Sequence, residues 1–177
     1  MMRLIKLGAW VAAGVVAGGC GVAVCPEPEG WRVEGEAVPE GVTEALALVR
    51  AAAPCQVDPE AWGGTVTFQE YPFWYENGPV EGLSTDVDCH PRLRVATYHR
   101  TNAVERTALV HELGHVAFAH CGWPSYDPFR SCHPQDFLVW AWQVDAALAA
   151  RLGHPAMPAY AAPAWACPEP PTAFTAR

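Results

Sequence analysis

The sequence is nearly devoid of lysine. Of its 11 basic residues only Lys6 is a lysine, and the arginines are scattered apart from Arg92 and Arg94. The formal net charge is −8 at pH 7. Proteins that bind nucleic acid need clustered basic side chains to neutralise phosphates. This composition therefore excludes nucleic acid as the partner.

Cysteine motifs for metal binding are missing as well. The chain has seven cysteines, at positions 20, 25, 55, 89, 121, 132 and 167. None of them forms a CxxC pair or a comparable zinc-knuckle spacing, which argues against a zinc site built from thiolates.

The first 19 residues have the layout of a bacterial export signal. Arg3 and Lys6 form a positive region, an apolar stretch follows, and small residues lead into Cys20. The apolar stretch is too short and too rich in glycine for a stable membrane span. We therefore expect residues 1–19 to be a signal peptide.

The position of Cys20 resembles the lipobox of bacterial lipoproteins, although Ala17 stands where leucine or valine is more usual. The resemblance implies that Cys20 is lipidated and anchors the mature chain in the cell envelope; simple secretion is the alternative. Loss of residues 1–19 removes Arg3 and Lys6 but no acid, so the net charge moves from −8 to −10. Six cysteines remain, an even number that suits disulfides in an oxidising compartment.

The mature chain is expected to form one domain with an irregular segment at each end. Residues 20–38 are rich in glycine, proline and glutamate and are expected to be a tether, and residues 168–177 a tail. The domain, residues 39–167, belongs to the α+β class. Hydrophobic periodicity and turn residues predict helices and strands at 40–53 (helix), 63–71 (strand), 92–99 (strand), 103–120 (helix) and 135–152 (helix), with turn chemistry at 75–82.

The stretch HELGH at residues 111–115 lies inside the predicted helix 103–120. Because His111 and His115 are four residues apart, they leave the same helix face about 40° apart. This is the spacing of two nitrogen ligands of a tetrahedral zinc ion, with Glu112 placed to take a proton from a zinc-activated water. Gly114 leaves room for a neighbour to pack close beneath the site.

The alternative is that the HExxH sequence arose by chance and binds no metal. With 7 histidines in 177 residues, an HExxH arises by accident in only about a few per cent of such chains. Three polar side chains buried among apolar neighbours would also be costly without a metal. We therefore expect one Zn²⁺ ion as the cofactor.

The segment VHELGHVAF, following the strand RLRVATYH, resembles the zincin metallopeptidases over about residues 63–152. The resemblance implies a zincin-like fold in which an edge strand precedes the motif helix. It implies that a protein or peptide substrate lies extended along residues 92–98 and that Glu112 is the catalytic base. Cys121 stands where metzincins have their third histidine, so this subfamily is excluded.

Four later residues are candidates for the third zinc ligand: Asp127, His133, Asp136 and Asp145. His133 is favoured because HPQDFLVW, residues 133–140, resembles the segment that carries the third histidine in SprT-like metallopeptidases, with Pro134 where glycine is usual. Cys121 and Cys132 bracket the preceding loop, and a disulfide between them would hold His133 near the metal. The pairs Cys55–Cys89 and Cys25–Cys167 would complete the framework.

The sequence leaves the oxyanion-stabilising residue open among Tyr98, Tyr126, His154 and Tyr160, and places His120 on the far side of its helix. The leading hypothesis is a membrane-anchored zinc metallopeptidase. The alternatives are a non-catalytic zinc-binding envelope lipoprotein and a metal-free lipoprotein stapled by disulfides. Glu112 favours the enzyme, because metal ligation alone does not require that acid.

Overall fold

The computed structural model describes residues 30–35, 38–71, 73–75, 78–80, 82–87, 90–97, 102–127, 132–155 and 166–168. The predicted signal peptide and lipidation site, Cys20, lie outside the described residues, as do Tyr98 and Tyr160.

A mixed four-stranded sheet forms the centre of the fold. Its strands lie in the order β1 (Trp31–Gly35), β2 (Gly64–Gln69), β6 (His90–Ala96) and β5 (Gly82–Val87). The first three are parallel, and β5 is antiparallel to β6. A separate hairpin pairs β3 (Phe73–Tyr75) with β4 (Gly78–Val80), where the turn residues were predicted.

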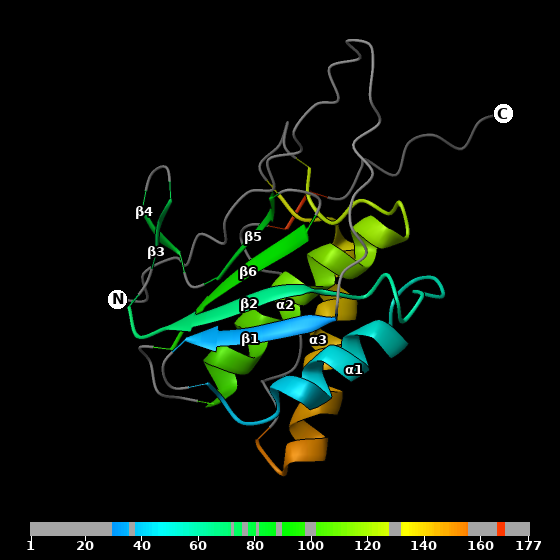
Figure 1. Ribbon diagram of the computed structural model, residues 1–177. Helices are drawn as coiled ribbons and strands as arrows, with labels where there is room; N and C mark the ends of the chain where they lie inside the picture. The colour runs from blue at the N-terminus through cyan, green and yellow to red at the C-terminus, as the bar shows by residue number, and fades with distance from the viewer. Residues whose placement is uncertain are drawn as a thin grey trace, which may run out of the picture.

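Three helices lie on one side of this sheet: α1 (Val42–Ala51), α2 (Asn102–His120) and α3 (Gln135–Leu152). Helix α2 packs against β5 and β6, and α1 and α3 pack against α2. Figure 1 shows α2 behind the sheet, with α1 and α3 beside it. Side chains from all three helices and from the inner face of β2 and β6 form one apolar core. The α+β class and the three helices are confirmed.

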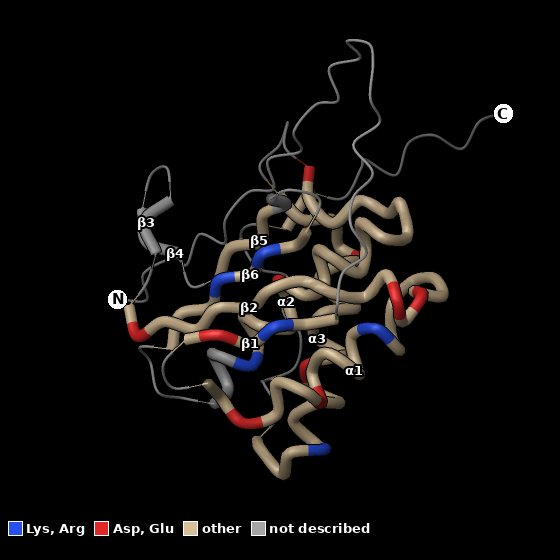
Figure 2. The backbone as a smooth tube through the Cα atoms, in the orientation of Figure 1, with Lys and Arg blue, Asp and Glu red and all other residues tan. Residues whose placement is uncertain are grey.

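The strand alternation predicted for β6 is also confirmed. Leu93 and Val95 are buried against the helices, whereas Arg92 and Arg94 are exposed on the opposite face. Figure 2 shows basic positions on β1 and β6. Among the described residues, no helix combines the length and apolar character that a bilayer span requires.

One strand lies where only a tether was expected. Residues 31–35, within the segment assigned to the tether, form β1 and pair in register with β2, from Trp31 opposite Gly64 to Gly35 opposite Phe68. The flanking glycines and prolines obscured a short strand that a parallel partner, distant in sequence, stabilises. The ordered domain therefore begins before residue 39.

The strand before the motif helix is not an edge strand, so this expectation was wrong. β6 lies between β2 and β5, and both of its backbone edges are paired. A substrate therefore cannot add to residues 92–98 as a new strand. β6 is an interior strand because β5 pairs antiparallel with the edge of β6 that faces away from β2. Within the described part of the chain, β5 has a strand neighbour on one side only.

The expected disulfide between Cys121 and Cys132 is also wrong. Cys55 is bonded to Cys121, and Cys132 to Cys167. The first bond links the segment after α1 to the end of α2, since these helices pack side by side. The pairings Cys55–Cys89 and Cys25–Cys167 fail with it, because Cys55 and Cys167 have these other partners.

Helices α2 and α3 approach each other closely at Gly114. A Cβ atom at this position would come within 2.5 Å of Trp140 Cζ3 and 3.0 Å of Phe137 Cε2. The indole of Trp140 also donates a hydrogen bond to the Ala52 carbonyl, 2.6 Å away, and so ties α3 to the end of α1. The expected room beneath the motif is therefore filled by two aromatic rings of α3.

Replacing Gly114 by alanine should destabilise the protein by up to about 2 kcal/mol. Overpacking a filled core costs about 1–3 kcal/mol, and the higher helix propensity of alanine returns about 1 kcal/mol. Chemical denaturation of the metal-free protein measures the difference. In a Trp140→Leu background the nearest clashing atom is absent, so Gly114→Ala should cost less there. Equal costs in both backgrounds would contradict the proposed contact.

Candidate metal centre

Helix α2 supplies the first two histidines of a buried cluster. His111 and His115 project from one face of the helix, one turn apart, and their Nε2 atoms are 3.2 Å from each other. Both side chains are buried, with 4% and 1% of their surface exposed. The apolar neighbours that made this part of α2 a core helix also remove its histidines from water.

His133 completes the cluster from the residues just before α3. Its Nε2 atom lies 3.2 Å from that of His111 and 3.4 Å from that of His115. The three ring nitrogens thus form a nearly equilateral triangle. Of the four candidates for a third ligand, the structure brings His133 to the two motif histidines.

The size of the triangle fits a tetrahedral metal ion. A zinc ion with nitrogen ligands at about 2.0–2.1 Å places those nitrogens about 3.3–3.4 Å apart. The observed separations of 3.2, 3.2 and 3.4 Å agree with this geometry. The three-histidine group can therefore hold a metal ion, through the same type of atom from each residue.

Ser125 fixes the ring of His115. Its Oγ atom lies 2.9 Å from His115 Nδ1, on the side of the ring opposite the cluster. When Nδ1–H donates to this hydroxyl, the lone pair of Nε2 is left for the metal. Sequence reasoning missed Ser125, because no motif marks a serine in a loop as a partner of a ligand.

The ring of Phe137 packs against all three imidazoles. It is stacked on His115 and His133, with ring centroids 4.8 and 5.6 Å apart, and meets His111 edge-on at 5.1 Å. The phenyl ring is fully buried. Phe137, expected only to pack α3, therefore restricts the orientation of each candidate ligand.

Glu112 is buried beside the cluster. Only 1% of its surface is exposed, and neither carboxylate oxygen has a hydrogen-bond partner among the described residues. Gly82 of β5 lies directly over it, since a Cβ atom there would be 2.6 Å from Glu112 Oε1. A buried carboxyl group without a partner is costly, and this makes Glu112 a candidate functional residue.

Burial keeps the whole cluster uncharged near neutral pH. Desolvation raises the pKa of Glu112 to about 8. Desolvation, followed by the charges of neighbouring histidines, holds the pKa values of His111 and His115 well below 6.5, and burial lowers that of His133 to about 4. Neutral imidazoles are the form that binds metal.

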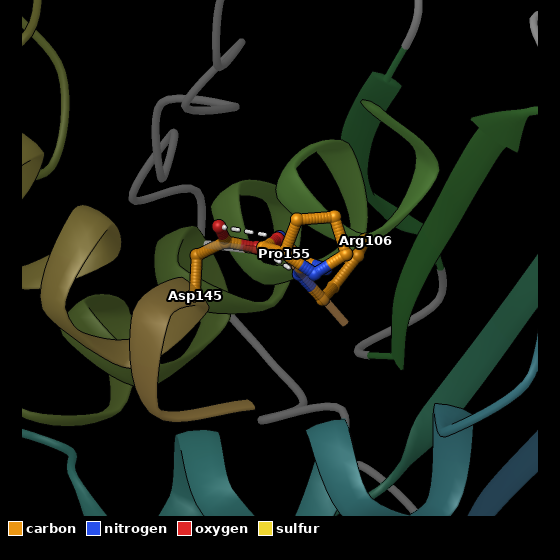
Figure 3. A network of polar contacts seen from close by, with 3 residues as sticks. All are labelled: Arg106, Asp145 and Pro155. Atoms are coloured by element: carbon orange, nitrogen blue, oxygen red, sulfur yellow. Dashed lines mark hydrogen bonds and ion pairs between the residues drawn. The ribbon is translucent and has the colours of Figure 1, made fainter. Parts of the chain in front are cut away.

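Asp145 is occupied elsewhere. Its carboxylate accepts two hydrogen bonds from the guanidinium of Arg106, at 2.7 and 3.1 Å, in a buried ion pair between α2 and α3 (Figure 3). Arg106 also donates to the Pro155 carbonyl at 3.4 Å. Because removing one partner of such a pair strands a buried charge, Asp145 acts as a structural residue here.

The other two aspartates also lie outside the three-histidine group. Asp136 is exposed in the first turn of α3. Asp127 lies with Cys132 and Cys167, whose sulfur atoms are bonded to each other and so are not metal ligands in this state. Of the oxyanion candidates, Tyr126 contacts His133, with ring centroids 5.1 Å apart. His154 Nε2 lies 3.9 Å from Glu40 Oε2. His120 is exposed, as expected.

No family model matches the chain, and neither the curated proteins nor the solved structures yield a match. The functional argument therefore depends on the geometry of the site.

Replacing Ser125 by alanine should weaken zinc binding by about 10–100-fold, the usual effect of losing a hydrogen-bond partner of a metal ligand. Competition with a chromophoric chelator measures the affinity. Ser84→Ala is the matched control, because Ser84 is equally buried and its hydroxyl has no hydrogen-bond partner among the described residues. Equal affinities for both variants would contradict the role of Ser125.

Proposed function

We propose that the protein is a zinc metallopeptidase with a zincin-like catalytic site. The single observation that carries this proposal is the triangle of Nε2 atoms, 3.2–3.4 Å on each side, with the buried carboxyl group of Glu112 next to it in the chain. His111, His115 and His133 would hold the ion. The HELGH motif and the resemblance to SprT-like metallopeptidases support the same function.

A zinc ion bound there would supply a water of pKa near 7 and polarise a substrate carbonyl. Glu112 would act as general base and take the proton of the attacking water, then return it to the leaving amine. Burial raises its pKa to about 8 in the metal-free protein, and a bound cation would lower this pKa towards the working pH, which suits a general base. Among the described residues, Tyr126 is placed closest to the cluster for oxyanion stabilisation, through its ring contact with His133.

The peptide substrate would bind along β5. This strand is antiparallel to β6, has no further strand partner among the described residues, and carries Gly82 over the carboxyl group of Glu112. A peptide that adds to its outer edge by main-chain hydrogen bonds would lie beside the catalytic base. The absence of a side chain at Gly82 lets the strand approach Glu112 this closely.

A second candidate is a non-catalytic metal-binding protein. The observation that favours it is the burial of all three histidines and of Glu112, each at most 4% exposed. Closed sites of this kind are typical of structural metal ions. The two candidates differ in their requirement for Glu112.

The proposal includes export to the cell envelope and a lipid anchor at Cys20. The disulfides Cys55–Cys121 and Cys132–Cys167 support an oxidising compartment, because such bonds are rare in proteins of the cytosol.

Substitution of Glu112 by glutamine should leave zinc bound and reduce peptide cleavage by several orders of magnitude, because the amide cannot accept the proton. His111→Ala and His115→Ala should lose metal and cleavage together. Elemental analysis and cleavage of an unfolded protein substrate measure both quantities. His120→Ala, on the same helix but exposed, is the control and should retain both. Wild-type cleavage by the Glu112→Gln variant would exclude the enzyme.

Zinc binding at pH 7 should release about 0.4–0.9 proton from Glu112. With a pKa of about 8, this group is mostly protonated in the metal-free protein, and a nearby cation lowers a carboxyl pKa by about 1–3. The histidines contribute little, since burial already keeps them neutral. Titration calorimetry in buffers of different ionisation enthalpy measures the total release, and the Glu112→Gln variant gives the part that comes from the zinc-bound water. The same release from the Glu112→Gln variant would contradict this assignment.

A further inference from the structure

The three candidate ligands are held in different ways. His111 and His115 are fixed relative to each other by the backbone of α2, whatever the rest of the chain does. His133 lies two residues before the first residue of α3 and outside any helix. Its position therefore depends on whatever restrains the backbone around it.

Two short pairings restrain that backbone. Cys132 and Asp127 exchange main-chain hydrogen bonds of 2.8 and 3.3 Å. On the other side, His133 pairs with Ala166, and the Cys167 amide donates to the His133 carbonyl at 2.8 Å. Residues 166–168 thus form a short brace along the backbone of the third ligand.

The Cys132–Cys167 disulfide joins this brace to the residue next to His133. The bond links positions 35 residues apart in sequence, and Cys132 is buried. Apart from the disulfide, the described contacts of the brace are the main-chain pairing with His133 and the packing of Ala166 on the cluster of Phe118, Phe137 and Leu138. One pairing of this size is weak compared with the chain entropy of holding a distant segment in place.

We propose that the Cys132–Cys167 disulfide positions His133 as the third metal ligand, so that the oxidised chain binds zinc tightly and the reduced chain does not. Both cysteines are positioning residues, because they act on the metal through His133. The inference rests on the metal binding proposed above and does not depend on peptide cleavage.

The switch is a two-electron exchange with an external dithiol. Its thiolate attacks one sulfur of the Cys132–Cys167 bond, and the resulting mixed disulfide is resolved by its second thiol. The protein gains two electrons and two protons as two thiols, and the external dithiol becomes a disulfide. The reverse reaction with an external disulfide rebuilds the brace. A chain with this property acquires its metal only after it reaches an oxidising compartment.

The variant Cys132→Ser/Cys167→Ser tests the proposal without new metal ligands. Serine is needed because free thiols at these positions, together with Asp127, would bring three ligand groups within 4.8 Å of one another. Cys55→Ser/Cys121→Ser is the matched control. Its bond spans 66 residues, so in the chain-entropy model it stabilises the fold at least as much, but it is not adjacent to a ligand.

Chelator competition should show zinc affinity about 10–100-fold weaker for Cys132→Ser/Cys167→Ser and within about 3-fold of wild type for the control. In a His133→Ala background the same serine pair should cause no further loss, since the ligand it positions is absent. Equal losses in the two disulfide variants, or a full additional loss in the His133→Ala background, would overturn the proposal. Absence of zinc binding by the wild type would instead overturn the metal site itself.

A second measurement uses the wild-type chain in case the serine pair prevents folding. Zinc-loaded protein is treated with a phosphine reductant, its thiols are alkylated, and released zinc is compared with the cysteines modified. Zinc release should follow alkylation of Cys132 and Cys167. Full zinc retention after both are alkylated, or release that follows Cys55 and Cys121 instead, would overturn the proposal.

Discussion

The candidate metal site depends on the close approach of α3 to α2 at Gly114. Phe137 and Trp140 occupy the space that a side chain at this position would need, with ring atoms 3.0 and 2.5 Å from the site of a Cβ atom. Because Phe137 also packs on the three imidazoles, the same contact that joins the helices sets the orientation of the ligands. The glycine of the motif is thus a packing residue whose effect reaches the three candidate ligands.

Burial on this scale has an electrostatic cost that the protein alone does not offset. Three imidazoles and one carboxyl group share a space from which water is excluded, and each stays neutral because burial shifts its pKa towards the uncharged form. The carboxyl group of Glu112 has no hydrogen-bond partner among the described residues, unlike Asp145, whose charge is balanced by Arg106. A divalent cation beside Glu112 would supply the missing partner. Asp145 therefore has its counter-ion within the protein, whereas Glu112 would find its partner in a bound cation.

Local sequence patterns predicted much of this arrangement and failed where distant segments meet. The helical spacing of His111 and His115 is a property of one helix, so it could be read directly. His133 was favoured by a resemblance, and its position was found in the triangle of nitrogens. Strand order, by contrast, depends on which segments pair across the sheet, and neither the interior position of β6 nor the strand β1 is encoded in their own residues. Ser125 was missed because no motif marks a serine in a loop as the partner of a candidate ligand.

The disulfides show most clearly why proximity in sequence misleads here. Cys121 and Cys132 flank one loop, yet each is bonded to a cysteine outside it, 66 and 35 residues away. A bond within the loop would restrain only the loop. The observed bonds instead connect each end of the loop to another part of the domain: the α2 end to the segment after α1, and the His133 end to residues 166–168. His133 is thereby tied to the core by links between segments distant in sequence, so the three-histidine group forms only when these segments have come together in the folded chain.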